Sequence, residues 1–117
     1  MNQPRKFDIY LEDILLSISR IHEYIGEMEF AEFKRNYLVV DAVVRNFEII
    51  GEAAKNIPEN IRHKYPFIPW KKMIGLRNLI THEYFGIDHE MIWTITKENL
   101  PQNSTDIQFI LESERKK

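Results

Sequence analysis

Apolar side chains recur at helical spacing along most of the chain, and the alternation typical of strands is nearly absent. In the first part they alternate spacings of four and three over three heptads, which predicts a helix over about residues 6–28. This apolar seam can pack inside a bundle or form a symmetric dimer interface, because both need the same stripe. It consists of Phe7, Leu11, Ile14, Ile18, Ile21, Ile25 and Met28.

The same periodicity predicts a second helix over about residues 33–57. Its expected core side comprises Tyr37, Val40, Val44, Phe47, Ile50, Ala54 and Ile57. Pro58 is tolerated in a first helical turn, so a short third helix follows through Lys64.

A fourth helix is expected from Trp70, and a fifth from the N-cap Asp88 until Pro101 stops it. Residues 102–117 are then a polar final helix or a frayed tail. These elements predict an all-α, antiparallel up-and-down bundle of four to six helices, in a single domain spanning residues 1–117.

Composition narrows the class of protein. With 117 residues and 44% hydrophobic content, the chain suits one domain with a modest core. The absence of cysteine removes disulfides and thiol chemistry, and suits a reducing compartment. No apolar run approaches the roughly 20 residues of a membrane span, and no signal peptide is recognisable. A cytoplasmic, soluble protein without a membrane association is expected.

The net charge of -2 hides an uneven distribution along the chain. Residues 45–77 carry seven Lys or Arg against three acids, whereas residues 83–114 carry only Lys97 against seven acids. The basic stretch can be an ordinary solvated surface or one that attracts phosphate.

The run Arg77-Asn-Leu-Ile-Thr-His82-Glu-Tyr84 combines a permanent cation, an imidazole and a phenol. Arginine can hold a phosphodiester, and histidine can move a proton near neutral pH without a metal. On an α-helix His82 lies roughly 140° round from Arg77. Either the helix ends or distorts near Thr81, or the cooperating arginine and histidine come from different chains. On spacing alone, the two side chains can equally cap helix carbonyls.

A charged stripe on the second predicted helix also needs an explanation. It comprises Asp41, Arg45, Glu48, Glu52 and Lys55. These residues form exposed ion pairs, or Arg45, Glu48 and Glu52 face a cleft and orient Arg77 or His82. Gly51 either allows a close helix approach or is simply tolerated, at a cost of about 1 kcal/mol relative to alanine.

The four histidines show no metal-site spacing, so neither a metal nor a cofactor is expected.

The pattern Arg77-x4-His82-x-Tyr84 resembles the R-x4-6-H-x-Y signature of the HEPN superfamily, specifically its HepT-like toxins. The block from Arg45 to Lys55 and the segments Pro69-Trp70 and Phe85-Gly-Ile-Asp88 resemble further parts of that family. The ordered set of blocks covers about residues 7–100 and is more specific than the short signature.

This resemblance implies a helical homodimer that cleaves RNA without metal, with Arg77 and His82 as catalytic residues. It also implies a partner, a minimal nucleotidyltransferase (MNT) antitoxin that neutralises the toxin by adenylylating Tyr84. Arg45, Glu48, Glu52 and Asn78 are then expected to support the site or contact RNA. The alternative is a noncatalytic nucleotide- or partner-binding module that docks the transferase, or an adaptor with a vestigial motif.

Overall fold

The computed structural model describes residues 6–82 and 88–116; the side chains of Lys6 and residues 79–82 also fall outside this description. All regular structure in the described part is helical, which confirms the predicted all-α class. None of the helices found there is both long and apolar enough to cross a membrane.

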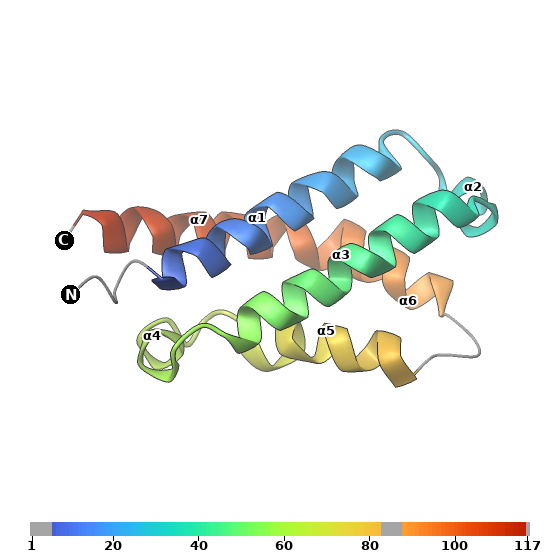
Figure 1. Cartoon of the computed structure of the whole chain (residues 1–117). Helices are drawn as coiled ribbons and strands as arrows, with labels where there is room; N and C mark the ends of the chain where they lie inside the picture. The colour runs from blue at the N-terminus through green and yellow to red at the C-terminus, as the bar shows by residue number, and fades with distance from the viewer. Residues whose placement is uncertain (1–5, 83–87, 117) are drawn as a thin grey trace.

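Four long helices form the body of the domain: α1 (Lys6–Ile25), α3 (Tyr37–Lys55), α5 (Trp70–His82) and α7 (Leu100–Arg115). α3 packs between α1 and α5, while the other side of α1 packs on α7. Successive long helices run in opposite directions, so α1 begins and α7 ends at the same end of the bundle (Figure 1). The predicted antiparallel, up-and-down arrangement is therefore confirmed.

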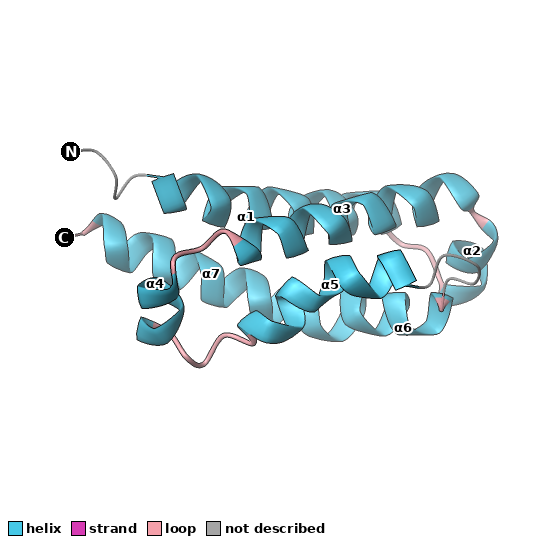
Figure 2. Cartoon of the chain, turned by 60° about the horizontal axis from the view of Figure 1, so that its bottom comes forward, coloured by secondary structure: helices cyan, strands magenta, loops and turns pink. Residues whose placement is uncertain are grey.

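Shorter helices close the two ends. α2 (Phe30–Arg35) contacts α6 (His89–Thr94) at one end, and α4 (Glu59–Lys64) lies at the other (Figure 2). The π-helix η2 (Ile95–Asn99) joins α6 directly to α7, which makes one long helical run facing α5. α4 begins directly after Pro58, which occupies its N-cap position without a side-chain hydrogen bond. The Asp88 side chain accepts a hydrogen bond from the Met91 amide at 3.0 Å and caps α6. Both helix starts were predicted.

The apolar seam of α1 lies in the core of the chain itself. Leu11, Ile14, Ile18, Ile21 and Ile25 are all buried, and Phe7 and Met28 pack against this core. Each fully buried aliphatic side chain contributes roughly 1.5–3 kcal/mol of hydrophobic free energy. Of the two interpretations of the seam, packing inside the bundle is the one found. The helix ends at Ile25, and Gly26 follows with a φ of 51°.

The prediction of a single helix over residues 33–57 is wrong, because Asn36 interrupts the helix. The Asn36 backbone is extended, with φ -95° and ψ 91°, so it ends α2 and begins α3. Its side-chain oxygen accepts a hydrogen bond from the Val39 amide at 3.1 Å and caps the new helix. Tyr37 therefore lies in a first turn and is 79% exposed, contrary to its expected place in the core.

Removing this cap should destabilise the fold. We expect Asn36→Ala to lower the free energy of unfolding by about 1 kcal/mol, because an orphan amide at the start of α3 loses its acceptor. Asn60→Ala on the exposed surface of α4 is the matched control and should change little. Urea unfolding measures both, and equal stabilities of the two variants would contradict the capping role.

The predicted stop at Pro101 is also wrong. Pro101 lies in the first turn of α7, where its missing amide hydrogen interrupts no bond that the helix needs. The preceding π-turn carries the chain through without a loop. The carbonyl oxygen of Thr96, a buried residue of η2, lies 3.2 Å from Nε2 of His22 on α1. This contact ties η2 to the first helix.

Candidate functional site

The first feature of the site is an ion pair between helices α3 and α5. The Nε atom of Arg77 lies 3.2 Å from Oε1 of Glu52, and both side chains are about half exposed. Because a guanidinium has five N–H donors, Arg77 can contact this carboxylate and a phosphate at once. The pair orients a cation at the surface, and its exposure limits its contribution to stability.

Gly51 lets the two helices meet at this point. A Cβ atom at position 51 would lie 2.8 Å from both the backbone nitrogen and the Cβ of Arg77, and 3.1 Å from the carbonyl oxygen of Ile74. These distances leave no room for a side chain, and two of the three neighbours are backbone atoms that cannot turn aside. Of the two interpretations of Gly51, close helix approach is therefore the one found. The glycine next to Glu52 fixes the position of Arg77.

A hollow of about 350 Å³ surrounds the ion pair. Arg45, Glu48, Glu52 and Arg77 all line it, so the structure brings together three of the predicted supporting residues and the predicted catalytic arginine. Arg45 and Glu48 also pair with one another, at 3.5 Å. The charged stripe on α3 is thus both a set of exposed ion pairs and the wall of a hollow that contains Arg77.

The remaining predicted residues are placed less completely. Asn78 is exposed on α5 beside Arg77, but it is not part of the hollow. His82 is the last residue of α5, but its side chain lies outside the described part of the structure. Tyr84 lies entirely outside it. α5 ends at His82, one residue after Thr81, so the helix end expected near Thr81 is found, but both position 77 and position 82 still lie within the helix. Positions 77 and 82 are then roughly 140° apart around the helix axis.

Three polar residues that line the hollow were not predicted from the sequence. Tyr10 and Asp13 come from α1, and Asn56 is the residue at which α3 ends. Tyr10 and Asp13 are three residues apart, so they share a helix face beside the apolar seam. That spacing could have indicated a polar wall, but only the packing of α1 on α3 places it opposite Glu52.

Comparisons with known proteins agree on the family. The family described as "Ribonuclease HepT-like" matches residues 14–110. "Putative RNase MJ1380" of Methanocaldococcus jannaschii is 40% identical over 91% of this chain and 97% of its own length. "Putative RNase TTE0752" of Caldanaerobacter subterraneus is 36% identical over 98% of this chain and all of its own length. "Probable ribonuclease HepT" of Thermococcus cleftensis is 42% identical, covering 79% of this chain and 84% of the relative. No match was found among solved structures.

Fold and site together define a small all-α bundle that presents an arginine from the end of a helix, held by a carboxylate on the neighbouring helix. The chain belongs to the HepT-like ribonuclease family. This confirms the family resemblance of the Arg77 to Tyr84 motif and its flanking blocks.

Proposed function

We propose that the protein is a metal-independent endoribonuclease that acts as a homodimer in the cytoplasm. The observation that carries the proposal is the fixed position of Arg77, which Glu52 and the close approach at Gly51 hold at the surface of α5. Membership of a ribonuclease family supports RNA as the substrate. Arginine is suited to this role because its planar cation binds phosphate oxygens in a defined geometry.

The proposed reaction follows from the side-chain chemistry. Neutral His82 takes the proton from a ribose 2′-hydroxyl, whose oxygen attacks the adjacent phosphorus. Arg77 stabilises the negative charge that develops on the phosphoryl oxygens. The bond to the 5′-oxygen breaks, and that leaving oxygen takes a proton from water. The products carry a 2′,3′-cyclic phosphate and a free 5′-hydroxyl.

The continuity of α5 supports a site shared between two chains. Because positions 77 and 82 point in different directions on one helix, the Arg77 and His82 that cooperate are proposed to come from opposite subunits. A dimer would then hold two equivalent composite sites related by its two-fold axis.

The proposed biological setting is a toxin–antitoxin module. A minimal nucleotidyltransferase antitoxin would transfer AMP from ATP to the Tyr84 hydroxyl and release pyrophosphate. The added phosphate would compete with RNA for the Arg77 cation.

Incubation with the transferase and ATP should add the mass of one AMP to the wild type and abolish cleavage. Tyr84→Phe should gain no mass and should still cleave RNA in the presence of the transferase; unchanged modification of Tyr84→Phe would contradict this assignment.

Glu52 is proposed as a positioning residue. We expect Glu52→Ala to lower kcat for RNA cleavage about tenfold with little change in KM, because the guanidinium loses orientation but keeps its charge. Glu52→Gln keeps an acceptor oxygen and should retain more activity. Stability should change little, because the pair is half exposed. Glu59→Ala on α4 is the control, and an equal loss of activity in that variant would contradict the assignment.

A cleavage assay tests the proposed activity. Unmodified protein is incubated with total RNA in the presence of a chelator, after mass spectrometry has confirmed that Tyr84 carries no AMP. Cleavage that leaves cyclic-phosphate ends is the expected result. If no RNA is cut and the protein still binds the transferase, the noncatalytic docking module becomes the better explanation.

A further inference from the structure

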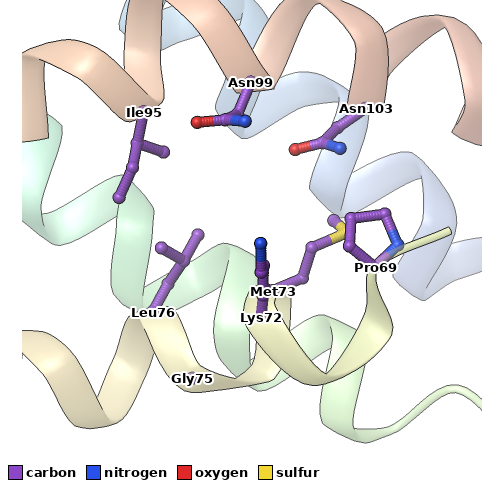
Figure 3. A pocket seen from close by; sticks show the side chains of 8 residues that line it. All are labelled: Pro69, Lys72, Met73, Gly75, Leu76, Ile95, Asn99 and Asn103. Carbon is purple, nitrogen blue, oxygen red and sulfur yellow. The ribbon is translucent and has the colours of Figure 1, made fainter.

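A second pocket lies on another side of α5, away from the hollow around Arg77. It encloses about 390 Å³ between α5 and the helical run of η2 and α7. Figure 3 shows the side chains that line it. Ile95, Asn99 and Asn103 are spaced by four along that run and form one wall. Met73 and Leu76 on α5 form part of the opposite wall. None of these residues lines the hollow that contains Arg77.

Asn103 is the least expected side chain in this pocket. It is only 7% exposed, yet its amide makes no hydrogen bond within the part of the chain that the structure describes. In contrast, the amides of Asn46 and Asn56 bond to the carbonyl four residues before them. The amide nitrogen and oxygen of Asn103 are not sealed from solvent, so a ligand in the pocket can reach them. Figure 3 shows that Asn103 instead points into the pocket.

The remaining wall groups define the chemistry of a ligand. Asn99 presents a second amide beside Asn103, and the ammonium of Lys72 points into the same space from α5 (Figure 3). Leu76 and Ile95 supply apolar contacts beside these polar groups. The π-turn that carries Ile95 and Asn99 is a feature found frequently at functional sites.

We propose that this pocket binds a nucleobase. Amides can donate to and accept from the edge of a base, and aliphatic walls can cover the faces of its ring. The Lys72 ammonium can then hold the attached phosphate. The volume lies at the lower end of the range of small-ligand sites, which suits a single nucleotide better than a partner helix. The base can belong to a free mononucleotide or to an RNA strand, and only the second source rests on the proposed ribonuclease activity.

Titration with the four nucleoside 5′-monophosphates, followed by calorimetry or NMR, tests the proposal. We expect at least one nucleotide to bind, and inorganic phosphate and ribose 5-phosphate to bind at least about tenfold more weakly because they lack a base. Asn103→Ala should weaken nucleotide binding about tenfold. Gly75→Leu should abolish it, since a Cβ at Gly75 meets no atom within 4 Å and the added side chain would occupy the pocket.

Arg77→Ala separates this pocket from the ribonuclease site. Nucleotide binding should survive in Arg77→Ala even when RNA cleavage is lost, and it should be measurable even if the wild type cleaves no RNA. Short 2′-deoxy oligonucleotides, which lack the attacking hydroxyl, distinguish the two sources of the base. Competition with the mononucleotide indicates a base of a strand, and binding of the mononucleotide alone indicates a free nucleotide. The proposal is overturned if no nucleotide binds, if phosphate alone binds equally well, or if folded Gly75→Leu binds as the wild type does.

Discussion

Arg77→Ala and His82→Ala should each lose RNA cleavage by about 100-fold or more. Removing a general base costs about 10²–10⁴ in rate, and removing the cation that stabilises the developing charge costs a similar factor. Both positions lie in the last two turns of α5, where alanine is a good helix former, so the variants should remain folded. Initial rates on a defined single-stranded RNA, with circular dichroism of each variant, measure the effect.

Asn78→Ala is the matched control for these two variants. Asn78 is exposed and adjacent to Arg77 on α5, but it does not line the hollow. The proposed contact of Asn78 with RNA predicts that Asn78→Ala affects KM more than kcat, and affects both much less than Arg77→Ala does. Retained cleavage by a folded His82→Ala protein would remove His82 from the reaction.

Gly51→Ala should both destabilise the fold and impair cleavage. The new methyl group would overlap the backbone of Arg77 and Ile74, so α3 and α5 must separate at the point that positions the cation. Overpacking of this kind costs about 1–3 kcal/mol, which exceeds the gain of about 1 kcal/mol from replacing a helical glycine. Urea unfolding gives the stability, and kcat on the same RNA gives the effect on the site.

Gly75→Ala provides a control in the neighbouring helix. A Cβ at Gly75 meets no atom within 4 Å, so only the helix-propensity term remains. We therefore expect Gly75→Ala to stabilise the protein by about 0.5–1 kcal/mol and to leave cleavage of RNA intact. Equal stabilities of Gly51→Ala and Gly75→Ala would contradict the close approach of the two helices.

Local signals in the sequence predicted much of the fold. The seam of α1, the start of α4 at Pro58 and the cap at Asp88 each depend on residues within one or two helical turns. The break at Asn36 was missed because the apolar periodicity continues across it, although Asn36 is a good N-cap residue. Pro101 was misinterpreted because a proline in a first helical turn and a proline after a helix give the same sequence signal.

The sequence predicted some of the residues that line the site, but not the contacts between them. The motif and the charged stripe on α3 indicated Arg77, Glu48 and Glu52, and the structure places all three around one hollow. The pairing of Glu52 with Arg77 depends on how closely α3 and α5 approach at Gly51. Inter-helix distance is a property of tertiary packing, so no periodicity within either helix could supply it.

A heterodimer assay tests the composite ribonuclease site most directly. Arg77→Ala and His82→Ala chains with different tags are co-expressed, and the mixed dimer is purified through both tags. If Arg77 and His82 cooperate across the interface, one of the two sites in each mixed dimer is intact, and cleavage should return to about half the wild-type rate. If the mixed dimer is as inactive as each parent dimer, while wild-type dimers cleave, the site does not combine Arg77 of one chain with His82 of the other.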